Sequence, residues 1–261
     1  MRQCSHFSIG KKNSSRQQNP GAGCSKVSAF HQRYAAFGVS SMFVGHYGPS
    51  FAIKSFQRSI SLWTLFLAVQ LLDVGWSVLV FCGLEKVRIV PGITASNPFD
   101  LYYMPFTHSL VAALAWGIGG IILCRLLLGI RDWLACIWMG TAVFSHWIFD
   151  FLVHRPDLPL YDNTAKIGLG LWNYPLIALA IEALLLFGGL IMYLRRTRPL
   201  NAVGRLGPPI FGVLMLAIQC LIFFGPPPIS PVAAAVTALV SYLAFAAVAA
   251  WLEHNRELAA A

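Results

Sequence analysis

The sequence predicts an all-α protein that crosses a membrane several times, a polytopic membrane helix bundle of about six transmembrane helices plus a short N-terminal helix. Of its 261 residues, 57% are hydrophobic and only 11% are charged, whereas a soluble domain usually has about 25% charged residues. The mean hydropathy of +0.65 points the same way. A chain of this composition cannot cover its surface with polar groups, so we expect lipid to surround it.

Six hydrophobic segments are long enough, at about 20 residues each, to cross a hydrocarbon core about 30 Å thick. They are 60–83, 107–130, 132–153, 173–194 and the two halves of the uncharged stretch 206–252, which Gly225-Pro226-Pro227-Pro228 divides. Glycine and proline at that point end one helix and let the chain turn. Ahead of the first span, 43–56 predicts a short helix that pairs with it around Arg58, as a hairpin or as a re-entrant segment.

Basic residues predict the orientation, because cytoplasmic loops are enriched in Lys and Arg. The edges at 58, 125–131 and 195–205 carry most of the arginines of the body, and Arg256 follows the last span. The connections at 84–106, 154–172 and 225–231 are poorer in basic residues. We therefore expect these three connections outside, the C-terminus in the cytoplasm, and a location in a bacterial-type inner membrane.

Residues 1–41 differ from the rest of the chain, since they are basic, rich in Ser, Gln and Gly, and lack a long hydrophobic run. They resemble a transit peptide in composition, and they are also explained as a disordered tail or as an extension upstream of a start at Met42. We divide the chain into this extension (1–41) and a transmembrane helical domain (42–261). The extension holds six of the 19 basic residues, and without them the net charge is only +3, which gives nucleic-acid binding little support.

Ionisable side chains inside membrane segments are costly and therefore point to function. Counting about 1.5 Å per residue from the basic edge of each segment places six of them at roughly 18–29 Å, in the outer half of the bilayer. These six are His46, Asp73, His108, His146, Asp150 and Glu182. Each residue alone is also explained by helix capping, packing or an interfacial hydrogen bond, but their common depth predicts a shared metal or proton site.

The pair His146 and Asp150 is the strongest local signal in this set. Residues four apart share a helix face, so the imidazole and the carboxylate point to one place. Neutral imidazole nitrogen and carboxylate oxygen suit a divalent cation such as Zn²⁺, Mn²⁺ or Fe²⁺. His154 continues this face by one turn, and Pro156 then ends the helix. His108 lies in the first turn of the second span, where free N–H groups favour anions.

Short motifs carry a resemblance to a known family. They are Gly45-His46, Leu71-Leu72-Asp73, Phe106-Thr107-His108-Ser109-Leu110 and Ser145-His146 with Asp150. In this order and in a membrane setting they resemble the inner-membrane metal-dependent hydrolases, also described as LexA-binding inner-membrane-associated hydrolases, over roughly residues 42–155. The resemblance implies a hydrolase activity and metal ligands at His46, Asp73, His108, His146 and Asp150. It implies no LexA partner here, because nothing in the sequence encodes one.

The chain departs from the family pattern at two places. The family has a second aspartate two residues after the first, where this chain has Gly75. The family also has a His-Arg-Gly lead before Thr-His-Ser, where this chain has Tyr103-Met104-Pro105. Two polar groups are therefore missing, which counts against a two-metal site and full activity.

The sequence thus predicts a hydrolase-like membrane protein that holds one divalent ion and acts on a lipid or lipid-linked substrate. Glu182 and Ser109 are candidates for catalytic roles, Glu182 by orienting a histidine or accepting a proton, while Ser109 is also explained as a helix-start residue. His154 and Arg155 in the loop above the site are candidates for binding an anionic substrate group, such as a lipid phosphate. A proton-coupled transporter and a non-catalytic scaffold with a degenerate metal site remain as alternatives.

Overall fold

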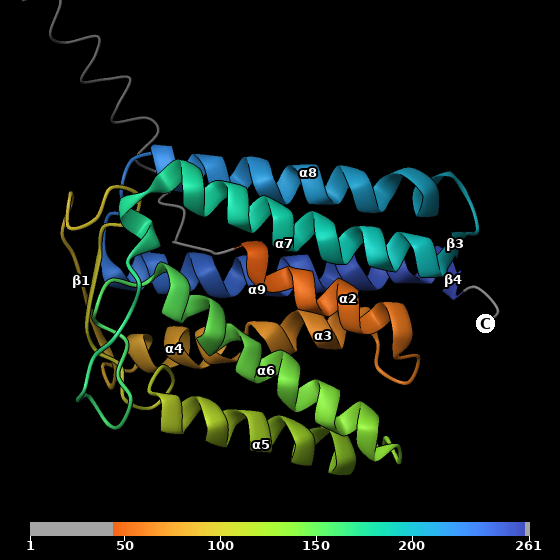
Figure 1. Cartoon of the computed structure of the whole chain (residues 1–261), viewed down its shortest axis with the longest axis horizontal. Helices are drawn as coiled ribbons and strands as arrows, with labels where there is room; N and C mark the ends of the chain where they lie inside the picture. Colours follow the sequence, from red (N-terminus) through yellow and green to blue (C-terminus); the bar gives the residue numbers. More distant parts are fainter. Residues whose placement is uncertain (1–43, 259–261) are drawn as a thin grey trace, which may run out of the picture. The chain divides into compact units, whose positions relative to one another are not determined.

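The computed structural model describes residues 44–258. The predictions for residues 1–41 lie outside the described residues. The described part begins with a 3₁₀ turn, η1 (Val44–Tyr47), and a short helix, α2 (Gly48–Phe56). The remaining helices follow as α3 (Leu62–Val69), α4 (Leu71–Phe81), α5 (Leu110–Leu126), α6 (Trp133–Val153), the 3₁₀ turn η2 (Leu171–Asn173), α7 (Pro175–Arg196), α8 (Ala202–Phe224) and α9 (Pro231–His254) (Figure 1).

Within residues 44–258, the four helices α6, α7, α8 and α9 are long and apolar enough to cross a membrane. The helices α3 and α4 together make a fifth such segment, but they are bent by 55° at the break between them. The helix α5 has 17 residues and is shorter than a full crossing usually requires. The chain is therefore a helical, multi-pass membrane protein, and the expected number of six spans is not confirmed.

Two small antiparallel sheets occur in the connections, where the sequence predicted only loops. The strands β1 (Lys86–Ile89) and β2 (Phe99–Tyr103) form a hairpin, and β3 (Thr197–Pro199) pairs with β4 (Arg256–Leu258). The all-α prediction is correct for the body of the protein and wrong for these connections. The hairpin, whose strand β1 is labelled in Figure 1, matters for the site described below because Phe99 and Leu101 of β2 line its cavity.

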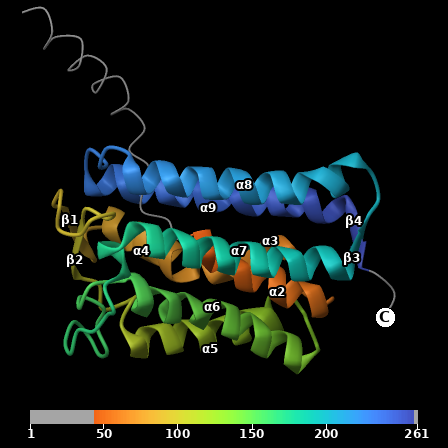
Figure 2. The ribbon, with the colours of Figure 1, turned by 45° about the horizontal axis from the view of Figure 1, so that its top comes forward.

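The helices pack in three tiers, which Figure 2 separates. The pair α8 and α9 forms one tier and the pair α5 and α6 forms another, with α2, α3, α4 and α7 between them. The three connections predicted on one side meet at one end. The first contacts the second, because the backbone N–H of Ser96 donates to the carbonyl of Trp172 (3.0 Å). The first also contacts the third, because residues from 91–98 and from 222–228 line one pocket. This common end agrees with the predicted alternation of the loops.

Local sequence sets where the helices start. Ser109, Asp132, Asn201 and Ser230 each accept a backbone N–H at the start of α5, α6, α8 and α9, respectively, which satisfies one of the free donors at a helix N-terminus. The helix α6 ends at Val153 with His154 as its C-cap, as expected from Pro156 two residues further on.

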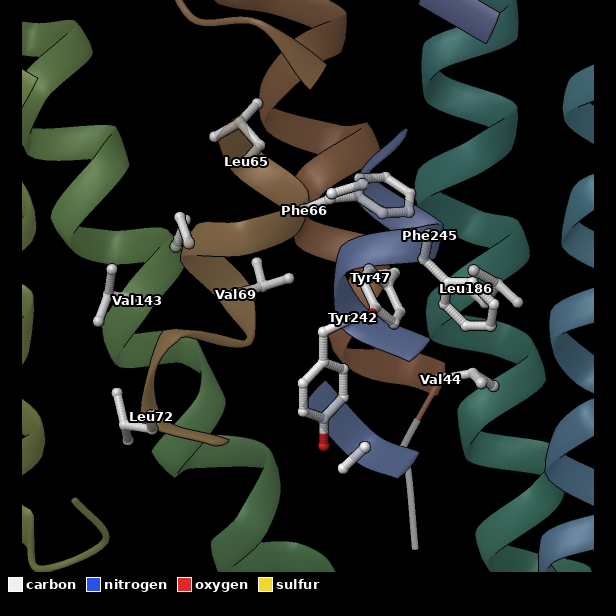
Figure 3. Close-up of a cluster of buried hydrophobic side chains, with 14 of the residues drawn as sticks. Val44, Tyr47, Leu65, Phe66, Val69, Leu72, Val143, Leu186, Tyr242 and Phe245 are labelled. Carbon is white, nitrogen blue, oxygen red and sulfur yellow. The ribbon is translucent and has the colours of Figure 1, made fainter. Parts of the chain in front are cut away.

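The apolar core lies where η1, α3, α7 and α9 meet, and Figure 3 shows its side chains. The ring of Tyr47 packs against Phe66 at 4.6 Å and against Phe245 at 5.7 Å between centroids. Tyr242 belongs to the same core, but its hydroxyl points away from the labelled apolar side chains (Figure 3). This core fixes the elements that carry the polar site beside it.

Candidate metal centre

The structure brings together all five residues predicted as metal ligands. His46 comes from η1, Asp73 from the first turn of α4, and His108 from the segment just before α5, while His146 and Asp150 lie on adjacent turns of α6. All of these side chains are buried except that of Asp73, which is 19% exposed. The five residues, which the count from the basic edge of each segment placed at a similar depth, therefore lie together in the structure.

Asp150 lies at the centre of the cluster. Its Oδ2 is 3.2 Å from Nε2 of His146 and 3.4 Å from Nε2 of His108, and its Oδ1 is 3.4 Å from Nε2 of His46. Oδ1 of Asp73 lies 3.2 Å from Nε2 of His108 and 3.5 Å from Nε2 of His146. Two overlapping ligand sets result: His46, His146 and Asp150, and Asp73, His108 and His146.

These distances fit donor atoms arranged around a cation. Atoms that bind one ion at about 2.0–2.2 Å lie roughly 3.0–3.5 Å from each other, whereas a charge-assisted hydrogen bond brings nitrogen to about 2.7–2.9 Å from oxygen. Oδ2 of Asp150 is buried and has no hydrogen-bond partner within residues 44–258, although two imidazole nitrogens lie nearby. The buried His and Asp side chains could therefore hold a divalent metal ion.

Two of the histidines are held so that Nε2 faces the cluster. Nδ1 of His146 lies 2.7 Å from the carbonyl oxygen of Val69; a carbonyl only accepts, so Nδ1 carries the hydrogen. Nδ1 of His108 lies 2.7 Å from Oγ1 of Thr107, whose own hydroxyl donates to Glu85 (2.7 Å). A hydrogen bond at one ring nitrogen orients the other as a ligand, which is the usual environment of a metal-bound histidine.

His46 has a different environment. Its Nε2 lies 3.2 Å from the carbonyl oxygen of His146 as well as 3.4 Å from Oδ1 of Asp150. Its ring packs on the ring of His146, with centroids 4.2 Å apart. As a ligand, His46 would exchange the hydrogen bond to the carbonyl for a cation.

The break between α3 and α4 corrects the expectation of a straight first span. The two helices meet at Gln70, where the path bends by 55°. Asp73 follows in the first turn of α4, and its Oδ2 accepts a hydrogen bond of 2.6 Å from the hydroxyl of Tyr242 on α9. The bend thus places a carboxylate in the cluster and frees the carbonyl of Val69 for His146.

His154 was predicted to bind substrate, and the structure places it in the cluster itself. Its Nε2 lies 3.7 Å from Oδ1 of Asp150, and its Nδ1 lies 2.9 Å from Oδ1 of Asp157. The ring is buried and packs against Trp172, with centroids 4.2 Å apart. His154 therefore faces the metal ligands with the same kind of support at Nδ1 as His108 and His146.

Arg155 was also predicted to bind substrate, but its guanidinium is engaged elsewhere. It pairs with Asp100 on β2 and, through Nε at 3.0 Å, with Asp157. Nearby, Lys166 donates to the carbonyl of Tyr102 (2.9 Å), and burial lowers the pKa of this lysine. These contacts join the hairpin of β1 and β2 to the loop 154–172. We call these two segments the cap, and Arg155 links them.

The two candidates for catalytic roles lie in other environments. The hydroxyl of Ser109 donates to the carbonyl of Pro105 (2.8 Å) and accepts the N–H of Ala112, so it acts as the N-cap of α5. Glu182 is fully buried, and its Oε2 accepts the backbone N–H of Val44 at 3.1 Å. Glu182 thus holds the turn that carries His46, and the catalytic roles of Glu182 and Ser109 stay predictions.

The cluster opens into a small cavity of about 40 Å³, which has room for roughly three water-sized particles. His46, Asp73, His108, Asp150 and His154 form its polar wall, together with the hydroxyl-bearing Tyr242. The rest of the wall is apolar and comes partly from the hairpin and the loop before α7: Trp76, Phe99, Leu101, Met104, Trp172 and Phe223.

The structure shows the surroundings of Gly75 and of the segment 103–105, where the chain departs from the motifs it resembles. A side chain at Gly75 would meet Thr107 and Trp116, with the nearest atoms 3.2 Å from an added Cβ. A second aspartate at this position would therefore be crowded by Thr107 and by Trp116 of α5. In the altered lead, Met104 is fully buried and lines the cavity, while the carbonyl of Pro105 accepts the hydroxyl of Ser109.

Sequence reasoning missed four supporting residues: Glu85, Thr107, Asp157 and Tyr242. The acids Glu85, two residues after the predicted first span, and Asp157, in the His154 loop, were usable signals by their positions, and both prove to be buried. Nothing in the sequence marked Tyr242, because its partner Asp73 is 169 residues away.

Comparisons with protein-family models, with curated proteins and with solved structures found no match to this chain.

Proposed function

We propose that this protein is a membrane-embedded, metal-dependent hydrolase that acts on a lipid or lipid-linked substrate in a bacterial-type inner membrane. The observation that carries the proposal is the position of Asp150, whose carboxylate is faced by the Nε2 atoms of buried histidines. Two of these rings, His108 and His146, are oriented through Nδ1. Such orientation is costly to build and characteristic of metal sites.

The surroundings of the cluster favour a lipid substrate. The cavity has an aromatic and aliphatic wall, with Phe99 and Trp172 on the cap and Trp76 and Phe223 on the helices. It lies near one end of membrane-spanning helices, which we assign to the outer side from the distribution of arginines. A polar headgroup at the cluster and an acyl chain along the apolar wall match this arrangement.

The chemistry divides between the ion and the chain. A divalent cation supplies an acidified water and polarises a phosphoryl or acyl oxygen. Asp73 and Asp150 supply the negative charge that retains a cation, and the hydroxyl of Tyr242 holds the carboxylate of Asp73 in place. The histidines and Asp150 are buried, and burial strengthens electrostatic interactions between them and a cation.

Metal content tests the proposal directly. The protein purified in detergent is expected to contain Zn, Mn or Fe, and His146→Ala and Asp150→Ala are expected to lose it. His254→Ala is the matched control, because His254 is exposed at the end of α9. Unchanged metal content in both site variants would refute the assignment of ligands.

Hydrolysis of lipid phosphates and lipid esters by the metal-loaded protein then tests the activity. Proton-coupled flux in vesicles without hydrolysis would favour a transporter instead. Full function in cells with His108 and His146 both replaced would favour a scaffold.

A further inference from the structure

We propose that Asp150 bridges two divalent cations, and that His154 provides a ligand to the second one. This inference rests on the metal site of the proposed function and deepens it. The four imidazoles near Asp150 divide into two pairs, one at each carboxylate oxygen. His108 and His146 face Oδ2 at 3.4 and 3.2 Å, and His46 and His154 face Oδ1 at 3.4 and 3.7 Å.

The first pair forms a complete subsite. Asp73 joins His108 and His146 through Oδ1, at 3.2 and 3.5 Å from their Nε2 atoms. With Oδ2 of Asp150 this gives three side chains and a carboxylate oxygen around one point, which is enough for a four-coordinate or five-coordinate ion. His154 lies at the other oxygen, so an ion in this subsite does not use its Nε2.

The second pair, His46 and His154, provides the beginning of another subsite at Oδ1 of Asp150. Neither Gly75 nor the lead at 103–105 belongs to this pair, so the polar groups missing there do not decide against a second ion. Nδ1 of His154 donates to Asp157, so its Nε2 is unprotonated when the ring is neutral and is available to a cation. Asp157 is in turn held by Nε of Arg155. The separation of 3.7 Å between Nε2 and Oδ1 of Asp150 is too long for a hydrogen bond, and it leaves space for an ion shared by both atoms. His46 and water complete the coordination.

Two cations at one bridging carboxylate indicate the class of substrate. Paired ions about 3.5–4 Å apart are typical of enzymes that cleave phosphate esters, because they hold the attacking and the leaving oxygen. Two divalent ions also exceed the charge of Asp73 and Asp150, so an anionic group lowers the cost of burying them. We therefore assign a lipid-linked phosphate ester as the substrate class. In its hydrolysis the oxygen of water bonds to phosphorus, the bond from phosphorus to the lipid oxygen breaks, and a proton passes from the water to that leaving oxygen.

The number of ions per chain tests this inference. The full chain in detergent is stripped with a chelator, reloaded with Mn²⁺ and desalted, and its Mn²⁺ is counted by elemental analysis. Low-temperature electron paramagnetic resonance then distinguishes the spectrum of a coupled pair from the six-line signal of an isolated Mn²⁺. We expect two ions with a coupled spectrum in the wild type, and one uncoupled ion in His154→Ala. The retained ion shows that the variant is folded.

A milder pair of variants covers the case in which His154→Ala misfolds. Asp157→Asn removes the carboxylate behind His154 and is expected to weaken the second ion 10–100-fold while the first is unchanged. Asp162→Asn in the same loop is the control and is expected to keep both ions, because Asp162 is exposed and its left-handed backbone (φ 48°) suits asparagine.

The outcomes separate the two proposals. One uncoupled ion in the wild type, unaffected by His154→Ala and Asp157→Asn, overturns the second subsite and leaves the metal-dependent function standing. Loss of both ions in a folded His154→Ala variant also overturns it, because that result means one shared site. No ion in the reloaded wild type overturns both proposals. Phosphate release from a short-chain phosphatidic acid, compared with cleavage of a short-chain carboxyl ester, tests the substrate class; cleavage of the carboxyl ester alone overturns that assignment.

Discussion

Nδ1 of His146 on α6 donates a hydrogen bond of 2.7 Å to the main-chain carbonyl of Val69 on α3, a residue 77 positions away in the chain. Val69 is the last residue of α3, so its carbonyl lies at the break in the first span. In an unbroken helix this carbonyl would accept the N–H of residue 73. The bend in the span and the orientation of a candidate ligand are therefore one structural feature.

Thr107→Val is expected to weaken metal binding 10–100-fold without unfolding the protein. The substitution removes the hydroxyl that connects Nδ1 of His108 to Glu85, so the ring of His108 loses the contact that orients it. Affinity is measured by competition with a chelator of known strength. Thr141→Val is the control, because the hydroxyl of Thr141 bonds only within α6 on an exposed face. Equal affinities in both variants would show that His108 needs no such support.

The sequence predicted five of the ionisable residues that meet, but Glu182, which was counted with them, accepts the N–H of Val44 instead, and His154, which was assigned to substrate, lies in the cluster. His46, Asp73, His108, His146 and Asp150 are polar in apolar segments, and a fixed rise per residue turns their positions into depths. His146 and Asp150 also share a face by their spacing alone. Because ionisable side chains in lipid are costly, they gather where they can pair with one another. Their meeting can therefore be predicted without knowing how the helices pack.

Other features were not predictable because they depend on distant contacts. No proline or glycine stands at the break between Val69 and Leu71, so no residue type there predicts the bend of 55°. The hydrogen bond from His146 satisfies the carbonyl of Val69 that the break leaves without its helical partner, and His146 lies far along the chain. The same holds for Arg155: its charge suggested a substrate group, whereas Asp100 on the hairpin supplies its partner.

Tyr242→Phe is expected to lower metal affinity roughly 10–100-fold, because a hydrogen bond to a charged group is worth about 1.5–3 kcal/mol. The hydroxyl of Tyr242 is the donor that holds Oδ2 of Asp73, and phenylalanine keeps the ring in the core. Chelator competition again gives the affinity, and thermal unfolding checks the fold. Tyr174→Phe, at an exposed ring before α7, is the control. An unchanged affinity in Tyr242→Phe would show that metal binding does not depend on the contact between Tyr242 and Asp73.

Arg155→Gln is expected to loosen the cap while the metal stays bound. The change leaves Asp100 and Asp157 without the guanidinium that joins them. Because Arg155 is partly exposed, the cost is on the order of 1 kcal/mol, which corresponds to roughly fivefold faster amide hydrogen exchange in 84–106 and 154–172. Arg88→Gln is the control, since Arg88 pairs with the same Asp100 but is largely exposed. A lost metal ion with unchanged exchange would instead place Arg155 at the site.

Gly189→Ala is expected to destabilise the protein by about 1–3 kcal/mol and to weaken metal binding as well. An added Cβ at Gly189 on α7 would clash with the carbonyl oxygen of Gly48, where α2 lies directly against α7. Since His46 is two residues before Gly48, displacement of α2 moves a candidate ligand along with it. Gly188→Ala is a close control, because nothing lies within 4 Å of a Cβ at that position, one residue away on the same helix.

The two readouts for Gly189→Ala separate packing from ligand position. Thermal unfolding in detergent reports the loss of stability, and chelator competition below the unfolding temperature reports the affinity of the folded state. Both are expected to fall for Gly189→Ala and to stay near wild type for Gly188→Ala. A destabilised Gly189→Ala protein with full metal affinity would mean that His46 keeps its position independently of α2. In that case the ligand would be anchored by η1 and by the contact of Glu182 with Val44, and that turn would then be the next place to substitute.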